Sequence, residues 1–307
     1  MTDELSLSGR VAVVTGAGNG LGATEAAALA AAGARLVLND LPGAALDGVA
    51  EKIRAAGGEA VVCPGDVAEW STGQALVRQA VESFGGLDIL VNNAGVLRDR
   101  MVFSMSEQEW DAVIRVHLRG HFVTTRFATA YWRERSKATG GPVYARIVNT
   151  SSEAFLLGSA GQPNYAAAKG GIVALTVATA RGCGRYGVRA NAICPRARTA
   201  MTGDLMGPAP QGPDPMAPER VAPLVTVLAG PAGARITGEV FVVHSDVVAV
   251  LGPPTVRATF HAADGQWSAA ELDAALAPMF ADYPPEPGFV CEETLPLAPG
   301  TFGETDS

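Results

Sequence analysis

The regular alternation of two kinds of segment is the feature that most limits how this chain can fold. Short runs rich in β-branched and other apolar residues, such as "RVAVVT" at residues 10–15 and "ARLVLND" at 34–40, are typical of buried strands. Longer Ala-rich stretches, such as "GATEAAALAAAG" at 22–33, separate these runs and are long enough for a helix. Alternation of this kind requires parallel strands joined by crossovers, with helices on both faces of the sheet. The sequence therefore predicts an α/β fold with a Rossmann-like, doubly wound parallel sheet.

Seven apolar runs predict seven strands. They lie at residues 10–15, 34–40, 59–66, 87–95, 144–152, 188–195 and 239–244. We expect residues 1–244 to form a single domain, since sheets with helices on both faces commonly reach this size. Residues 245–307 are then a C-terminal extension. Within it, Ser268 and Glu271 have the spacing of a capping box, which predicts a helix at about 269–280.

Charge and composition exclude several classes of partner. The net charge of -8 opposes binding to nucleic acid phosphates, and no basic patch offsets it, so we expect no nucleic acid partner. No apolar run approaches the ~18 residues of a membrane span, and the first ten residues lack the features of a signal peptide. We therefore expect no membrane contact and a cytoplasmic location. The scattered cysteines, expected to be free thiols, are Cys63, Cys183, Cys194 and Cys291.

A glycine-rich segment, "TGAGNGLG" at residues 15–22, directly follows the first predicted strand. Glycines permit a tight turn and a close approach of the backbone to a pyrophosphate, which the N-terminus of the next helix attracts. Asp40 ends the second predicted strand, twenty residues after Gly20. Its carboxylate can accept hydrogen bonds from the ribose hydroxyls of a dinucleotide and would repel a 2'-phosphate. No basic residue stands beside Gly16 or Asp40, so the sequence predicts NAD as the cofactor.

The segment "NYAAAKGG" places Tyr165 and Lys169 one helical turn apart. A tyrosine with an ordinary pKa of about 10 is a poor base at neutral pH, and a lysine cation one turn away favours its phenolate. We expect Tyr165 to accept the proton of an alcohol as hydride leaves for the nicotinamide, with Ser152 hydrogen-bonding the same oxygen. For this tyrosine taken alone, a buried hydroxyl that merely finds a partner is the alternative. The cofactor motif favours the catalytic role.

Together these motifs resemble the short-chain dehydrogenase/reductase family over roughly residues 9–243. Gly16-xxx-Gly20-x-Gly22 has the glycine spacing of that family, and "GDV", "NNAG" and a serine thirteen residues before Tyr165 follow in the same order. The resemblance implies that Lys169 also holds the nicotinamide ribose, and that the enzyme is a homotetramer or a homodimer. It implies cofactor contacts from Gly16, Asn19, Gly20, Leu21, Gly22, Asp40, Leu41, Asp66, Val67, Asn93, Ala94, Gly95, Tyr165, Lys169, Pro195, Thr199 and Met201.

Two of the four histidines, His117 and His121, lie one helical turn apart in "VHLRGH". Zinc enzymes use this spacing, but no Glu follows the first histidine and no third ligand is evident, so we expect no metal. The resemblance places His117 where the family usually has an asparagine, whose backbone carbonyl helps to hold a water that links the lysine to solvent. We expect His117 to preserve that carbonyl in the catalytic set, with a proton-carrying imidazole as the alternative. His121 is expected to be a packing or surface histidine.

Four further segments, "NNAGVLRDRMVF", "RVHLRGHF", "GQPNYAAAK" and "RARTAMT", narrow the resemblance. They are similar to the (R)-specific 3-hydroxyacyl-CoA dehydrogenase domain of peroxisomal multifunctional enzymes, and to actinobacterial relatives that act on acyl-CoA or steroid-derived substrates. The resemblance implies an NAD-dependent oxidoreductase that interconverts a 3-hydroxyacyl-CoA and a 3-oxoacyl-CoA as its small-molecule substrates. A hydroxysteroid or other bulky alcohol dehydrogenase is the alternative, and a non-catalytic NAD-binding sensor or scaffold is an alternative of another class.

Two arginines and a segment rich in Pro and Gly follow the sixth predicted strand. Arg196 and Arg198 either meet the phosphates of coenzyme A or pair with surface acids, and the sequence leaves both alternatives open. The stretch at 203–220 cannot form a long helix. We therefore expect a substrate loop or lid at about 196–220.

Overall fold

One sheet organises the molecule. The computed structural model describes residues 3–43, 45–202 and 207–281 of the 307-residue chain. Its strands follow the order β3-β2-β1-β4-β5-β6-β7-β8, and the first seven in sequence pair in parallel. These seven match the expected runs: β1 Val11–Thr15, β2 Arg35–Asn39, β3 Glu59–Val62, β4 Ile89–Asn92, β5 Ala145–Thr150, β6 Val188–Pro195 and β7 Val240–His244.

The expected count of seven strands is wrong by one, because Val247–Val250 forms β8 at the edge of the sheet. It pairs antiparallel with β7, with His244 opposite Val247. A two-residue turn joins the two strands, and Ser245 in that turn has a left-handed φ of 49°. The alternation of strands with helices in the sequence does not predict such a hairpin.

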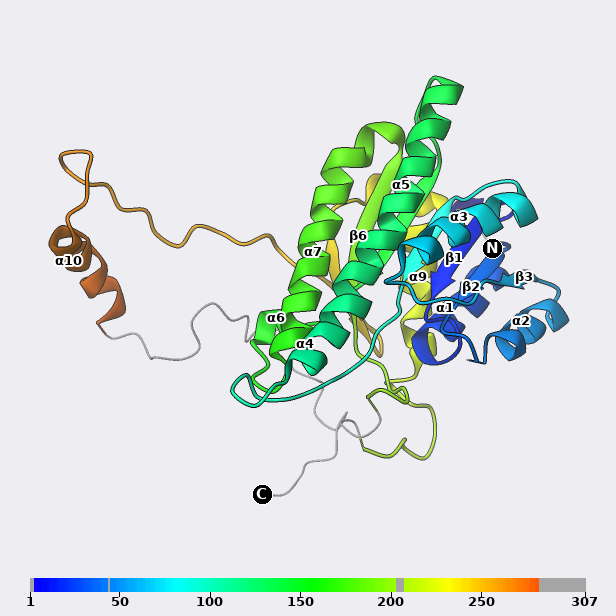
Figure 1. Cartoon of the computed structure of the whole chain (residues 1–307), viewed down its shortest axis with the longest axis horizontal. Helices are drawn as coiled ribbons and strands as arrows, with labels where there is room; N and C mark the ends of the chain where they lie inside the picture. The colour runs from blue at the N-terminus through cyan, green and yellow to red at the C-terminus, as the bar shows by residue number, and fades with distance from the viewer. Residues whose placement is uncertain (1–2, 44, 203–206, 282–307) are drawn as a thin grey trace.

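Helices cover both faces of the sheet, so the doubly wound fold is confirmed (Figure 1). One face carries α1 Gly20–Ala31, α2 Leu46–Ala55 and α9 Ala222–Ala229. The other face carries α3 Trp70–Phe84, α5 Gly120–Thr139 and α7 Pro163–Cys183. Most buried strand residues between the two layers are apolar, as expected for strands covered on both sides.

Shorter elements lie at the carboxyl edge of the sheet, where the cavity is. They are α4 Glu107–Ile114, the π-helical turn η2 Arg115–Arg119 and α6 Ala154–Leu157. The helix α4 begins at a capping box formed by Ser106 and Glu109, and η2 joins it directly to α5. Single π-helical turns often mark functional sites.

The C-terminal extension contains a helix at Ala269–Phe280, α10, with both capping-box hydrogen bonds between Ser268 and Glu271. None of its residues is buried, and it lies away from the sheet at the end of an extended segment (Figure 1). The division into a domain at 1–244 and an extension at 245–307 stays a prediction. β8 ties the first residues of that extension to the sheet.

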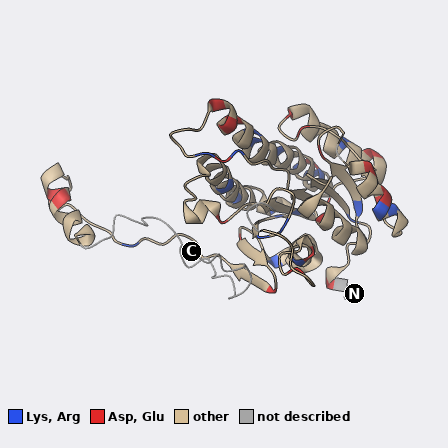
Figure 2. Cartoon of the chain, turned by 90° about the horizontal axis from the view of Figure 1, so that it is seen from below, with Lys and Arg blue, Asp and Glu red and all other residues tan. Residues whose placement is uncertain are grey.

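The surface carries both signs of charge. Lys and Arg are interspersed with Asp and Glu over the described part of the chain (Figure 2). Among the residues that the structure describes, every helix is too short or too polar to span a bilayer.

Candidate active site

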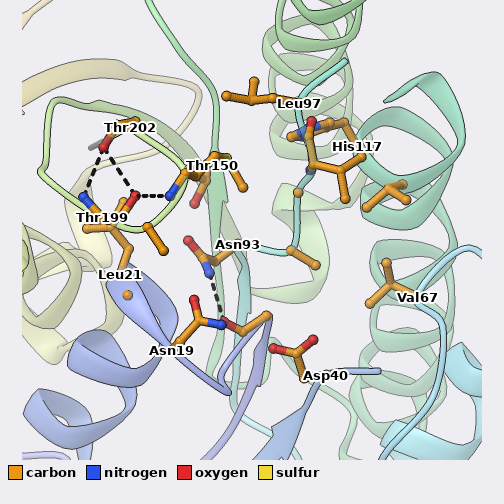
Figure 3. Close-up of a pocket in the computed structure, with 18 of the residues that line it drawn as sticks. Asn19, Leu21, Asp40, Val67, Asn93, Leu97, His117, Thr150, Thr199 and Thr202 are labelled. Carbon is orange, nitrogen blue, oxygen red and sulfur yellow. Dashed lines mark hydrogen bonds between the residues drawn. The ribbon is translucent and has the colours of Figure 1, made fainter. Parts of the chain in front are cut away.

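A cavity of about 490 Å³ lies beyond the carboxyl ends of the parallel strands. Its lining includes every predicted cofactor residue except Gly22, together with His117. Asp40 lies at one end of the cavity, and Leu97 and His117 lie at the other (Figure 3). Sequence reasoning missed further lining residues, most of which directly follow a strand or extend a predicted motif: Asn39, Gly65, Val96, Leu97, Arg98, Val116, Thr150, Ser151, Ala197, Ala200 and Thr202.

The glycine loop after β1 brings the backbone close to the cavity. Gly16 and Gly20 have left-handed φ values of 65° and 53°, which other residues rarely adopt. A Cβ at Gly16 would lie 2.8 Å from the Cα of Ala94, and a Cβ at Gly22 would lie 2.2 Å from the carbonyl oxygen of Gly16. The absence of a side chain at Gly22 thus allows α1 to pack against the loop. Gly22 itself does not line the cavity.

The N-terminus of α1 is suited to an anion. Asn19 caps the helix without a side-chain hydrogen bond to its first turn. The first N–H groups of a helix have no partner within it and favour phosphate. Both Asn19 and Gly20 line the cavity, so a pyrophosphate there would meet these groups.

The Asp40 carboxylate is held in place at the end of β2. The backbone N–H of Gly18 donates to its Oδ2 (3.0 Å), and the N–H of Leu41 donates to its Oδ1 (2.8 Å). Farther along the cavity, Asp66 forms an ion pair with Arg115 (2.5 Å) and accepts a hydrogen bond from the N–H of Ala68. These contacts fix the direction of both carboxylates.

Tyr165 lies on the first turn of α7, where it is partly buried and lines the cavity near Ser152. The Ser152 hydroxyl is near enough to the phenol to affect its pKa, and it accepts the N–H of Ala154 (3.2 Å). Burial raises the pKa of Tyr165 to about 12, although the hydrogen bond from Ser152 lowers it in part. Ser152 does not line the cavity, but it lies near the phenol of Tyr165, as the sequence predicts.

Lys169 is buried one turn after Tyr165, with its Nζ 5.2 Å from the centre of the tyrosine ring. The ammonium donates to the carbonyl of Thr150 (2.6 Å), and burial lowers the pKa of Lys169 to about 7. In this structure Lys169 does not lower the pKa of Tyr165, contrary to the expectation from spacing. Burial raises the pKa of Tyr165 instead.

His117 forms a wall of the cavity between the segment after β4 and Tyr165. Its Nε2 lies 2.8 Å from the carbonyl oxygen and 3.0 Å from the backbone nitrogen of Val96, and its ring meets the tyrosine ring edge-on at 5.2 Å. A Cβ at Gly95 would lie only 2.3 Å from the imidazole. Burial holds the pKa of His117 well below its ordinary value, so the ring is neutral.

The arginines after β6 pair with carboxylates. Arg196 forms a bidentate pair with Glu153, with Nε–Oε2 at 2.5 Å and Nη2–Oε1 at 2.7 Å. Arg198 Nε lies 2.8 Å from Asp214 Oδ2. Of the two alternatives, the structure has the pairing with acids, and both pairs are largely shielded from solvent. Sequence reasoning missed Glu153 and Asp214, since no pattern links them to the arginines.

No group of three His, Cys, Asp or Glu side chains that could hold a metal ion occurs in residues 3–43, 45–202 and 207–281. The pair in "VHLRGH" is divided between two surroundings. His117 lines the cavity, whereas His121 is buried in α5 and does not line it.

The profile of a known family, described as short chain dehydrogenase, matches residues 10–206, a range that contains the glycine loop, Asp40, Ser152, Tyr165 and Lys169. The chain belongs to the short-chain dehydrogenase family. As a short-chain dehydrogenase, it is an oxidoreductase of secondary alcohols. The family match ends within the segment after β6, and the C-terminal extension lies beyond it.

Relatives of this short-chain dehydrogenase cover most of the chain. It is 51% identical to the hydroxyacyl-CoA dehydrogenase ChsB1 of Mycobacterium tuberculosis in an alignment of 304 positions that covers 96% of each protein. It is 36% identical to a peroxisomal hydratase-dehydrogenase-epimerase of Neurospora crassa, over 82% of this chain but 28% of that protein. The crystal structure of a short chain dehydrogenase from Mycobacterium avium has a TM-score of 0.83 and 47% identity, and covers 92% of this chain and 98% of its own.

Proposed function

We propose that this short-chain dehydrogenase oxidises a 3-hydroxyacyl-CoA to the 3-oxoacyl-CoA with NAD, and catalyses the reverse reduction. The observation that carries the proposal is the grouping of Ser152, the phenol of Tyr165 at the cavity and Lys169, whose Nζ lies 5.2 Å from the centre of the tyrosine ring. The similarity to a hydroxyacyl-CoA dehydrogenase over 96% of the chain supports the acyl-CoA substrate.

The residues around the cavity fit NAD. The open first turn of α1 would bind the pyrophosphate, and the fixed carboxylate of Asp40 would accept the hydrogen bonds of the adenosine ribose. A 2'-phosphate at that place would face the Asp40 charge. When bound, NAD supplies the acceptor for a hydride.

Proton transfer is the task of the chain's own residues. When the alcohol is oxidised, the phenolate of Tyr165 accepts its O–H proton, and the hydride released from its C–H bond would go to the bound cofactor. In the reduction the phenol returns this proton to the ketone oxygen. The pKa of about 12 keeps Tyr165 protonated at neutral pH, ready for that step. Ser152 holds the substrate oxygen beside the phenol in both directions.

A substrate screen tests the proposal. Purified enzyme is mixed with NAD and with a series of 3-hydroxyacyl-CoAs, hydroxysteroids and simple secondary alcohols, and NADH formation is followed by absorbance. We expect the 3-hydroxyacyl-CoAs to give the highest kcat/KM. A higher kcat/KM for free hydroxysteroids would replace the acyl-CoA assignment with the bulky alcohol alternative. NAD binding without turnover of any alcohol would contradict the proposed activity altogether.

A further inference from the structure

Asn164 is a buried residue that directly precedes Tyr165 and that the proposed mechanism does not use. It lies on the first turn of α7 with 0% of its surface exposed. Its Nδ2 donates to the carbonyl oxygens of Arg98 (2.9 Å) and Glu109 (3.1 Å). Its Oδ1 accepts the backbone N–H of Tyr165 (2.7 Å). Both N–H donors and the oxygen of the carboxamide therefore have partners, which fixes the orientation of this group.

The stretch after β4 is tied to the start of α7 at two more points. The backbone N–H of Arg100 donates to the carbonyl of Gly161 (2.8 Å). The Nε2 of Gln162 donates to Asp99 Oδ2 (2.8 Å), in a position exposed to solvent. Asn164 is the fully buried member of this connection, which joins segments 66 residues apart in the sequence.

The stretch that Asn164 holds is a wall of the cavity. Three of its consecutive residues line the cavity together with Tyr165, and these are Val96, Leu97 and Arg98. Figure 3 shows Leu97 beside His117 at one end of the cavity. His117 contacts the backbone of Val96 through Nε2, and Asn164 holds the carbonyl of Arg98. The segment 96–98 is thus fixed at both of its ends.

We infer that Asn164 is a positioning residue, which sets the gap between the segment 96–98 and Tyr165 and thereby selects one enantiomer of the alcohol. The inference rests on the proposed function, in which the alcohol oxygen meets the phenol of Tyr165. One carboxamide holds the backbone of Tyr165 on one side and the carbonyl of Arg98 on the other. With the oxygen at the phenol and the C–H bond toward the cofactor, two enantiomers differ in which carbon substituent occupies each remaining place. A wall held at a fixed distance from the phenol discriminates between them.

The first test is amide hydrogen exchange in the full-length enzyme, followed by mass spectrometry without cofactor or substrate. Asn164→Leu keeps a similar volume but has no donor, so the carbonyl of Arg98 loses its buried partner. We expect peptides that span residues 96–100 to exchange about tenfold faster than in the wild type, because local opening becomes easier. Unchanged exchange in these peptides would overturn the inference. Faster exchange in an enzyme that oxidises no 3-hydroxyacyl-CoA would contradict the proposed function and leave the role of Asn164 in holding the wall intact.

The second test is the ratio of kcat/KM for the two enantiomers of the secondary alcohol that the wild type oxidises best. This ratio is a property of the active molecules, so a variant that is merely less stable keeps it. We expect Asn164→Leu to lower the ratio about fivefold or more, with NAD affinity within about threefold of the wild type. Asn164→Asp is the second variant, to be used if Asn164→Leu does not fold. It keeps the shape and the acceptor for the N–H of Tyr165 but lacks the two N–H donors, and we expect the same direction of change.

Asn191→Leu is the matched control. Asn191 is a buried asparagine on β6 that does not line the cavity. Its Nδ2 donates to the carbonyl of Ile236 (2.9 Å), and its Oδ1 accepts the N–H of Glu239 (3.1 Å), so the variant loses the same kinds of hydrogen bond elsewhere. Its enantiomer ratio and its exchange at residues 96–100 should match those of the wild type. A wild-type ratio in active Asn164→Leu would overturn the inference, as would an equal fall of the ratio in both variants.

Discussion

At the residue scale, Asp40 and Glu25 are two carboxyl groups with contrasting surroundings. Asp40 accepts two backbone N–H groups at the edge of the cavity, where a carboxylate can meet a ribose. Glu25 on α1 is fully buried, and neither of its oxygens has a partner among the described residues. Burial raises the pKa of Glu25 to about 8.

We expect the Asp40 carboxylate to favour NAD over NADP by at least tenfold in kcat/KM, or about 1.4 kcal/mol, because it repels a 2'-phosphate. Asp40→Asn removes the charge and should narrow the ratio, whereas Asp47→Asn, at an exposed position on α2, should leave it unchanged. Steady-state kinetics with both cofactors measure the ratios. Equal efficiency of the wild type with NAD and NADP would contradict the role of Asp40.

Glu25 predicts a pH-dependent stability. Between pH 4.5 and 8 the unfolded chain releases the Glu25 proton while the folded chain keeps it, so the free energy of unfolding falls as pH rises through this window. The loss is on the order of 5 kcal/mol above pH 8. Glu25→Gln should remove most of this slope in urea unfolding, and Glu51→Gln, exposed on α2, should keep it. Parallel curves for wild type and Glu25→Gln would show that Glu25 ionises normally.

At the scale of elements, the sequence predicts the parallel strands well because apolar β-branched runs must be buried on both faces. The capping box of α10 is equally predictable, since Ser268 and Glu271 are only three residues apart. Features that depend on packing between distant segments were not predictable. The burial of His121, the pair of Arg196 with Glu153 and the raised pKa of Tyr165 all arise only when the helices meet the sheet.

The segment after β6 gives a prediction for the proposed lid. Arg198 binds Asp214, and the N–H of Arg198 donates to the carbonyl of Met216, so this pair ties the start of the segment to its end. Asp214→Asn weakens the tie and should raise KM for the acyl-CoA about threefold to tenfold, or ~1 kcal/mol, with a smaller effect on kcat. Glu219→Gln, exposed in the same segment, is the control. An unchanged KM would show that this ion pair has no part in substrate binding.

At the scale of the whole molecule, the helix α10 of the C-terminal extension has no buried residue. Trp267 and Phe280 are 39% and 52% exposed. An amphipathic helix with a complete cap ordinarily buries its apolar side against another surface. A neighbouring subunit would provide one, in keeping with the homotetramer or homodimer that the sequence predicts.

Truncation after Val250 tests this role while leaving β8 in place. We expect the truncated enzyme to form an assembly with fewer subunits, or to have a lower kcat/KM for large acyl-CoAs, with NAD binding preserved. Light scattering and steady-state kinetics measure the two effects. An unchanged number of subunits and unchanged kinetics would show that the extension is dispensable.

The most direct test of the central claim is NADH formation from a 3-hydroxyacyl-CoA by wild type and Tyr165→Phe, with NAD affinity measured in parallel by calorimetry. The phenol acts on the reacting oxygen and not on the dinucleotide, so turnover should fall at least ~100-fold while NAD affinity stays within about threefold. Retention of most turnover by Tyr165→Phe would contradict the account.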